Sequence, residues 1–221
     1  MDQVDAHSHD SPGSGSIHDH PEFFDEAAKT WDHDPAKVER ARVVATQIVE
    51  IVDPSSDARL LEYGAGTALV AESLRDHVGA MTLADTSSGM REVMAAKVAD
   101  GRLPGSTRIW DLDLESQKPP AGEQFDLVVA VQVLHHVHDL ATVLAHLAEL
   151  LAPGGHLCVV DLETEDGSFH GEGFGGHHGF RRDDLAERLE VSGFADVAFR
   201  HAYDIDKDGR SYPLFLATAR R

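Results

Sequence analysis

Short apolar runs alternate with helix-forming stretches along most of this chain, and this alternation constrains the fold more than any other feature. Helical patterns lie between the apolar runs, up to about His77, over Ser87–Ala99 and over Asp139–Leu151. Strands that alternate with helices of this length are typical of βαβ units, which build a parallel sheet. The runs predicted to be strands are Arg59–Tyr63, Ala80–Asp85, Ser106–Asp111, Phe125–Val131 and His156–Leu162.

The pattern changes near the C-terminus. A predicted helix over Asp183–Ser192 is followed by two apolar runs, Asp196–Ile205 and Ser211–Arg220, on either side of the turn residues 207–209. This arrangement predicts an antiparallel hairpin at one edge of the sheet. We therefore expect an α/β fold with a doubly wound, Rossmann-like, seven-stranded and mostly parallel sheet that ends in an antiparallel C-terminal hairpin.

Length and composition predict one domain with a short tail. The 221 residues, 42% of them hydrophobic, suffice for one buried core, so we expect a single domain over residues 21–221. Residues 1–20 are rich in Asp, His, Ser and Gly, which predicts a disordered tail. No apolar run approaches the roughly 20 residues needed to cross a bilayer, and no leader peptide is recognisable. These features predict a cytoplasmic protein with no membrane partner.

The excess of acidic residues limits the partners that the chain is expected to bind. Acidic residues number 39 against 19 basic ones, for a formal net charge of -20. A surface of this charge repels a phosphate backbone, so we expect no nucleic-acid partner and favour a small-molecule substrate. The single cysteine, Cys158, lies inside an apolar run and is predicted to be a small core residue rather than a catalytic thiol.

A glycine-rich turn, Gly64–Thr67, follows the first predicted strand. Glycine lets the backbone adopt positive φ and approach a ligand closely, and open α/β sheets bind ligands at the carboxyl ends of their strands. The dinucleotide fingerprint needs a third glycine, but Leu69 breaks that pattern. Asp85 ends the second predicted strand, where a carboxylate can accept both ribose hydroxyls of an adenosine. Asp85 fits NAD and S-adenosylmethionine equally.

Acidic residues also follow the third predicted strand, in the sequence Asp111-Leu112-Asp113. A carboxylate at this position can accept a hydrogen bond from an adenine amino group while the leucine packs on the ring. Structural alternatives remain open for each acidic residue. Asp85 is also suited to cap the next helix, Asp111 to form a turn, and Glu62 to be a solvated strand end.

Taken together, these residues resemble the class I S-adenosylmethionine-dependent methyltransferases, in their small-molecule branch. The resemblance runs from about Phe23 to the C-terminus and implies direct in-line transfer of a methyl group from S-adenosylmethionine to a small acceptor. Further segments that carry it, in this order along the chain, are Phe23–Pro35, Ala84–Met90, Phe125–Val137 and Leu151–Asp161.

The resemblance also implies which residues hold the cofactor. Gln132 and Val133 would approach its methionine carboxylate and methyl region. Because the pair Asp-Leu occurs twice in succession, it stays open whether Asp111 or Asp113 binds the adenine amino group. Asp111 is preferred. Tyr63 departs from the small or aliphatic residue of many relatives, and its ring either packs near the cofactor or fills the sheet. The other implied contacts are Glu62, Gly64, Ala65 and Gly66 at the methionine end, Asp85 at the ribose, and Thr86, Met90 and Leu112 at the adenine.

The acceptor side is predicted from two segments. The front of residues 21–52 resembles a helical lid, in which Phe24 and Trp31 are candidate substrate contacts; a plain amphipathic helix is the alternative. Residues 166–180, rich in Gly and His, form a long insertion that we predict to be a substrate loop. His135 and His177 are further candidate substrate contacts. For an acceptor that must lose a proton, the candidate bases are His136 and His178, since free imidazole titrates near pH 6.5.

Three rival hypotheses remain. An NAD-dependent oxidoreductase is disfavoured by Leu69 and by the lack of a Tyr-x-x-x-Lys motif. A non-catalytic module that binds S-adenosylmethionine uses the same fold. Metal binding is the third, but neither Cys-x-x-Cys nor His-Glu-x-x-His occurs, so we expect no bound metal. The 15 histidines of the chain include two groups that raise this third hypothesis, His135, His136 and His138, and His170, His177 and His178.

Overall fold

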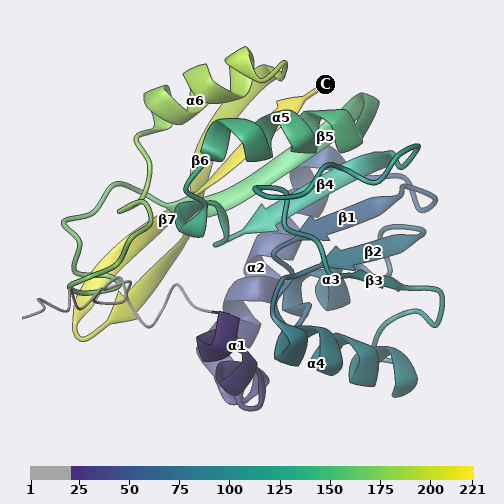
Figure 1. Cartoon of the computed structure of the whole chain (residues 1–221), viewed down its shortest axis with the longest axis horizontal. Coiled ribbons are helices and arrows are strands. Elements are labelled where there is room, and N and C mark those ends of the chain that lie inside the picture. The colour runs from purple at the N-terminus through teal and green to yellow at the C-terminus, as the bar shows by residue number, and fades with distance from the viewer. Residues whose placement is uncertain (1–20) are drawn as a thin grey trace, which may run out of the picture.

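A seven-stranded sheet runs through the protein in the strand order β3-β2-β1-β4-β5-β7-β6 (Figure 1). The computed structural model describes residues 21–221; the predicted disordered tail, residues 1–20, lies outside the described residues. The α/β class and the seven strands predicted from the sequence are confirmed. The strands are β1 (Leu60–Tyr63), β2 (Met81–Ala84), β3 (Arg108–Trp110), β4 (Phe125–Val131), β5 (Leu151–Leu162), β6 (Ala195–Lys207) and β7 (Arg210–Arg220).

The strand order places a topological switch point at the middle of the sheet. Strands β1 to β5 pair in parallel, whereas β7 runs antiparallel to both β5 and β6. The predicted C-terminal hairpin is therefore confirmed, at the left edge of Figure 1. Strand order reverses direction between β1 and β4, and in open α/β sheets this switch point is where ligands bind, beyond the carboxyl ends of the strands.

Helices cover both faces of the sheet. Buried side chains of α2 and α3, with Met94 of α4, join one hydrophobic cluster, and those of α5 and α6 join a second cluster on the opposite face. Figure 1 shows α5 and α6 together, apart from α2, α3 and α4. The helices are α1 (Pro21–Ala28), η2 (Trp31–His33), α2 (Pro35–Val52), α3 (Leu69–Leu74), α4 (Ser88–Ala99), η3 (Leu134–His136), α5 (Leu140–Leu150) and α6 (Arg182–Val191).

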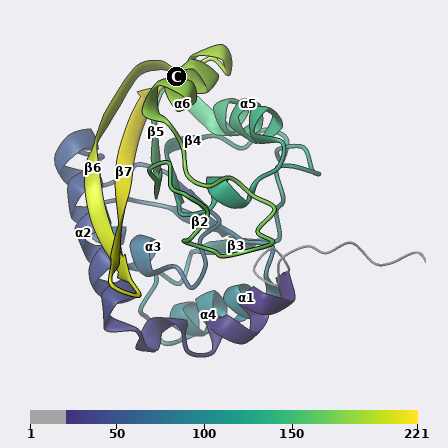
Figure 2. The same ribbon diagram turned by 90° about the vertical axis from the view of Figure 1, so that its left-hand side faces the viewer.

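The predicted lid, residues 21–52, consists of two different parts. Helix α2 is a core helix, because Val44 and Ile48 are fully buried against the sheet. Helix α1 instead lies along α4 (Figure 2), where Asp25 Oδ1 accepts hydrogen bonds from Ser87 Oγ at 2.6 Å and Gly89 N at 2.8 Å. Helix α2 is therefore not part of a lid, and the lid prediction is confined to α1 with η2.

A buried lysine fastens η2 to the body of the protein. Lys97 of α4 is only 2% exposed, and its Nζ lies 2.7 Å from Asp32 Oδ2 and 3.1 Å from Glu72 Oε2. Asp32 also accepts a hydrogen bond from Thr67 Oγ1 at 2.6 Å, directly after the glycine turn. A buried ammonium requires such paired carboxylates, so this network fixes the position of η2 beside the turn.

Within residues 21–221, the structure has no helix that is both long and apolar enough to span a membrane.

Candidate active site at the carboxyl edge of the sheet

The glycine turn after β1 adopts the positive φ angles that the sequence predicted. At Gly64, φ is +67° and an added Cβ would lie 2.3 Å from Cγ2 of Val133, so this position has no room for a side chain. At Gly66, φ is +55° but an added Cβ would meet no atom within 4 Å. The turn therefore packs tightly against the end of β4 at Gly64 and faces open space at Gly66.

Asp85 links this turn to the end of β2. Its Oδ2 accepts a hydrogen bond from Gly66 N at 2.8 Å, and its Oδ1 accepts one from Ser87 N at 2.9 Å. Burial raises the pKa of the carboxyl above its usual value, while these backbone donors act in the opposite direction. A carboxylate has about four acceptor sites, so some remain for a ligand. The N-cap of α4 is Ser87, which accepts from Met90 N, so the alternative role of Asp85 as the helix cap is wrong.

Glu62 is a buried acid rather than a solvated strand end. It is 3% exposed, which contradicts that structural alternative, and its Oε2 accepts a hydrogen bond from Ala71 N of α3 at 2.9 Å. Burial raises its pKa to about 8. Glu62 therefore carries a proton at neutral pH, and that proton makes it a hydrogen-bond donor beside the glycine turn.

The residues after β3 differ in what they contact. Asp113 is held by its own loop, because it accepts from Glu115 N at 2.9 Å and from Ser116 Oγ at 2.6 Å. Asp111 pairs with Arg91, with both contacts at 3.1 Å, and its side chain stays 66% exposed. Asp111 is thus the more available carboxylate of the two, as the sequence analysis preferred. Leu112 between them is buried.

Three further predicted positions surround the same edge. Met90 is buried at the start of α4, whereas Thr86 is exposed and its carbonyl accepts a hydrogen bond from Arg91 at 2.8 Å. Ala65 is buried and its N–H donates to Ala84 O at 3.0 Å, which joins the turn to β2. Tyr63 fills the sheet, because its buried ring belongs to the hydrophobic cluster under α5.

The end of β4 has a sharp change of backbone direction. Gln132 has φ +52°, and its N–H donates to Val160 O of β5 at 2.7 Å. This conformation turns the chain into η3 and places Val133 against Gly64. Gln132 and Val133 therefore lie between the glycine turn and the histidines of η3.

His135 is buried against a carboxylate that the sequence analysis missed. Its Nδ1 lies 2.6 Å from Asp161 Oδ1, and its backbone N–H donates to Asp161 Oδ2 at 3.2 Å. Asp161 is fully buried near the end of β5. The available signal was an acidic residue inside an otherwise apolar predicted strand, since burying a carboxylate requires a hydrogen-bonding partner.

The two candidate bases have different surroundings. His136 is half-buried, with its ring 5.5 Å from the ring of Phe24 on α1. His178 is exposed on the loop after β5, and its Nδ1 lies 3.2 Å from Glu165 Oε1. Of the two, His136, which belongs to η3, is the one whose ring contacts a ring of the front helix.

The remaining predicted acceptor residues lie in the same region. The ring centroids of Phe24 and Trp31 are 6.3 Å apart, and Lys37 Nζ lies 3.8 Å from the centroid of the Trp31 ring. The backbone N–H of His177 donates to His135 O at 2.7 Å, which ties the loop to η3. Burial lowers the pKa of His177, which favours a neutral ring.

Comparison with known proteins identifies relatives of this chain. A family model described as a methyltransferase domain matches residues 37–199. An uncharacterised methyltransferase of Schizosaccharomyces pombe is 28% identical over 161 residues, which cover 68% of this chain and 56% of that protein. The chain thus spans about half the length of that relative, and it spans only 3% to 6% of several matching polyketide synthases and hybrid synthetases.

Solved structures share the fold at low sequence identity. A methyltransferase of Haloferax volcanii, solved in complex with the activator Trm112, has a TM-score of 0.73 at 16% identity and covers 89% of this chain and 96% of its own. The magnesium protoporphyrin IX methyltransferase of Synechocystis, solved with bound SAM, has a TM-score of 0.61 at 18% identity, with coverage of 84% and 82%. At these identities the likeness shows the fold.

Proposed function

This chain belongs to the methyltransferase domain family, and we propose that it transfers a methyl group from S-adenosylmethionine to a small-molecule acceptor. The family match covers most of the described chain and supports methyl transfer as its activity. The bound SAM of the magnesium protoporphyrin IX methyltransferase, which shares the fold, supports S-adenosylmethionine as the cofactor. An NAD-dependent oxidoreductase has no support from these relatives. The assignment of individual residues and the nature of the acceptor are the parts that we propose.

The residues at the carboxyl edge fit S-adenosylmethionine. The observation that carries the proposal is the Asp85 carboxylate, which is held by the N–H groups of Gly66 and Ser87 next to the open space at Gly66. Ribose hydroxyls would donate to Asp85, and the adenine amino group would donate to Asp111. The protonated Glu62 would support the methionine end through the glycine turn.

When bound, S-adenosylmethionine supplies a methyl group that its sulfonium already activates for attack. The protein then has to position the acceptor, exclude water and, for an OH, NH or SH acceptor, remove a proton. Helix α1 and η2 exclude water, because they cover the edge beside the glycine turn and are fastened there by Asp25 and Asp32. His136 is our proposed base, since its half-buried ring lies beside Phe24 of this cover.

The small-molecule acceptor is supported by two observations. The magnesium protoporphyrin IX methyltransferase, which shares the fold, acts on a small molecule by its name. The net charge of -20 also disfavours phosphate-rich partners. The cytoplasmic location and the absence of a nucleic-acid partner stay predictions.

Isothermal titration of S-adenosylmethionine and S-adenosylhomocysteine into the full-length chain tests the cofactor site. We expect micromolar binding of both, weakened tenfold or more, or about 1.4 kcal/mol, by Asp85→Ala. The matched control is Asp76→Ala, because Asp76 is an exposed acid at the end of α3. Equal affinities in the wild type and Asp85→Ala would contradict the assigned site, and no binding to the wild type would contradict the function.

Acceptor size is tested separately with a methyl-labelled donor. The labelled donor is incubated with a metabolite extract in the presence and absence of the enzyme, and the products are separated by ultrafiltration. We expect the label in the low-mass fraction. Label found only in retained protein or nucleic acid would contradict a small-molecule acceptor.

A further inference from the structure

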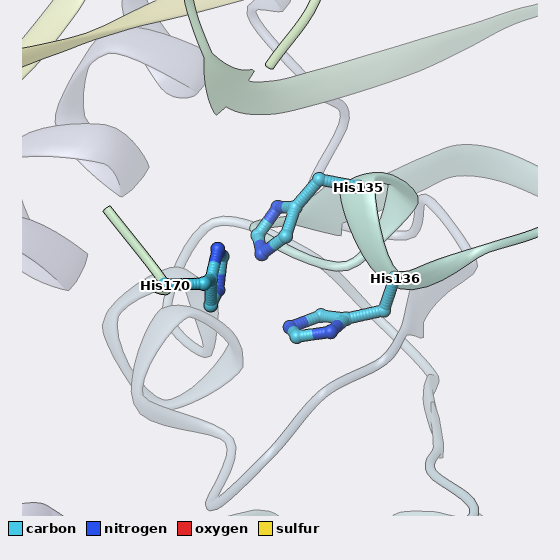
Figure 3. A group of neighbouring side chains, drawn as sticks. All are labelled: His135, His136 and His170. Atoms are coloured by element: carbon cyan, nitrogen blue, oxygen red, sulfur yellow. The ribbon is translucent and has the colours of Figure 1, made fainter. Parts of the chain in front are cut away.

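Three histidines from two separate segments converge beside the acceptor region. His135 and His136 belong to η3, and His170 belongs to the loop after β5. One ring nitrogen from each residue lies within 4.8 Å of those of the other two. Figure 3 shows the three imidazole rings facing a common small space. Imidazole nitrogen is the commonest protein ligand for zinc and related divalent metals.

His135 is oriented for metal binding by the buried Asp161. An imidazole that donates its Nδ1 proton to a carboxylate has its lone pair on Nε2, and metal-binding histidines are usually held this way. The 2.6 Å contact from His135 Nδ1 to Asp161 Oδ1 meets this condition. Asp161 is itself fixed, because Oδ1 accepts from Leu162 N at 2.8 Å and Oδ2 from His135 N at 3.2 Å.

The other two rings are positioned by aromatic neighbours. The Phe174 ring stacks on that of His170, with centroids 3.8 Å apart and planes at 10°. The Phe24 ring meets that of His136 edge to face at 5.5 Å. These contacts form a mostly apolar shell around the histidines, and such a shell limits water and strengthens metal binding.

The loop that carries His170 is held closely against η3. A Cβ at Gly176 would lie 2.1 Å from His135 O, so only glycine allows this approach. The neighbouring His177 N donates to the same carbonyl at 2.7 Å. The backbone of residues 176–177 therefore packs against the His135 carbonyl and holds the loop beside η3.

The ligand geometry indicates the class of metal. Metal to nitrogen bonds of about 2.0–2.1 Å place two ligating nitrogens roughly 3.3 Å apart in a tetrahedral site. The nitrogens here lie within 4.8 Å of one another, so the three rings must draw closer together to bind one ion. Three imidazoles with an open fourth position are typical of catalytic zinc sites, and imidazole also suits Co²⁺ and Ni²⁺.

We propose that His135, His136 and His170 bind one divalent transition-metal ion of the Zn²⁺ class, whose open coordination position receives the acceptor. This reverses the sequence-based expectation of no metal. The site lies next to the methyl-transfer region, since Val133 separates η3 from Gly64 and Phe24 belongs to the cover. Only this role in methylation rests on the proposed function; metal binding itself does not.

The role in the reaction follows from the charge of the ion. A hydroxyl or thiol of the acceptor that coordinates the ion has a lower pKa and releases its proton to solvent. With the ion bound, His136 is a metal ligand whose lone pair is occupied, so the ion takes over the proton removal that is proposed for His136 in a metal-free site. Its oxygen or sulfur lone pair then forms the new bond to the methyl carbon, and the carbon–sulfur bond of the sulfonium breaks with its electron pair left on sulfur. The inference thus specifies an acceptor with an acidic OH or SH group.

Metal binding is tested with Co²⁺ and Zn²⁺ on the metal-free, full-length chain. In every protein used, His7, His9, His18 and His20 are replaced by Gln, because other imidazoles also bind these ions. Co²⁺ is followed by its visible absorbance, and Zn²⁺ by competition with a chromophoric chelator. We expect one ion per chain with micromolar or tighter affinity.

Variants then assign the ligands. We expect a loss of affinity of at least 100-fold for His170→Ala and for His136→Ala, and of 10- to 100-fold for Asp161→Asn, the usual range for such supporting residues. His138→Gln is the matched control, since His138 follows η3 but is 65% exposed and is not among the three converging residues. Its affinity should equal that of the background protein. His170 lies on a loop, so its variant keeps the test valid if His136→Ala fails to fold.

Several outcomes would overturn the proposal. They are less than one ion bound per chain, equal affinity in His170→Ala and His138→Gln, or a Co²⁺ spectrum without imidazole ligands. S-adenosylmethionine binding to the EDTA-treated protein separates the two proposals. If the cofactor binds and Asp85→Ala weakens it while no metal binds, only the metal site fails.

Discussion

The cofactor half and the acceptor half of the carboxyl edge are built in different ways. In the cofactor half, around Gly66 and Asp85, the ligating groups are held mainly by backbone N–H groups at the ends of neighbouring strands. In the acceptor half, around His135 and His170, side chains from η3, the loop after β5 and α1 hold one another.

This difference predicts which properties of the protein a substitution in each half will affect. Backbone geometry after a strand depends on local residues and on the sheet, so it is fixed wherever the sheet forms. The acceptor half depends on contacts between segments that only tertiary packing brings together. We therefore expect substitutions in the cofactor half to act on stability and cofactor binding, and those in the acceptor half to act on metal and acceptor binding.

The largest expected effect is at Lys97, which anchors the cover over both halves. Lys97→Ala removes the buried cation between Asp32 and Glu72 but leaves Arg102, which pairs with both. We therefore expect a loss of about 3–4 kcal/mol of unfolding free energy, below the upper limit for an unpaired buried charge. Urea denaturation measures this loss. Lys29→Ala is the control, since its ion pair with Glu26 is exposed. A loss below about 1 kcal/mol in Lys97→Ala would show that the cover is not anchored there.

Gly64→Ala is expected to cost about 2–4 kcal/mol of unfolding free energy, from the positive φ and from the clash with Val133. Val133→Ala in the same chain should recover part of the loss. Gly66→Ala, which meets no atom, should cost only about 1 kcal/mol but should weaken S-adenosylmethionine binding. Thermal or urea unfolding of each variant measures its stability, and calorimetric titration with S-adenosylmethionine measures its affinity for the cofactor. Equal stability of Gly64→Ala and Gly66→Ala would contradict the close packing at Gly64.

Glu62 should give the stability of the cofactor half a distinct pH dependence. Its folded pKa of about 8 exceeds the usual value of 4.5, so the folded state holds a proton that the unfolded state releases between these values. The contribution of Glu62 to the free energy of unfolding should therefore be fully present below about pH 4.5 and be lost as the pH rises to about 8, by up to about 1.4 kcal/mol per pH unit.

Glu62→Gln removes this component, so its unfolding free energy should vary less steeply over that pH window. Urea denaturation at several pH values compares the variant with the wild type and with Glu92→Gln, an exposed position on α4. The same slope in all three proteins would argue against a buried, protonated Glu62.

The assignment of the adenine contact to Asp111 rather than Asp113 predicts a smaller difference, between variants of these two residues. Asp111→Asn should weaken S-adenosylmethionine binding several-fold with little change in stability, because its ion pair with Arg91 is exposed. Asp113→Ala should cost about 1 kcal/mol of stability through the lost hydrogen bonds to Glu115 and Ser116, with cofactor affinity unchanged. Calorimetric titration and urea unfolding of both variants check this. The reverse result would move the adenine contact to Asp113.

The smallest expected effect is at His178. His178→Gln removes a contact with Glu165 and a tilted ring contact with Phe174, but the His178 side chain is 45% exposed. Unfolding free energy should therefore change by less than about 0.5 kcal/mol, and metal affinity should not change. With an acceptor in hand, His136→Gln should lower kcat far more than His178→Gln does. A larger loss in His178→Gln would transfer the role of base to the loop.

The local sequence was enough for the strands, the hairpin and the cofactor half. The apolar runs predict the five parallel strands, because burial on both faces of a parallel sheet requires them. The two runs on either side of the turn residues 207–209 predict the last two strands. Gly64, Gly66 and Asp85 could be predicted as cofactor contacts because their strand ends meet at one edge of such a sheet. The sequence favours Asp111 over Asp113, and the structure adds that Asp111 pairs with Arg91 whereas Asp113 is bonded within its own loop.

The acceptor half was determined by tertiary structure. The sequence indicated histidine groups in two segments but divided them by proximity along the chain, with His138 in one group and His170 in the other. Folding instead brings His170 to His135 and His136, places Asp161 behind His135, and leaves His138 exposed. The physical reason is that strand ends follow from local apolar patterns, whereas a loop position depends on backbone contacts with distant segments, such as Gly176 against His135.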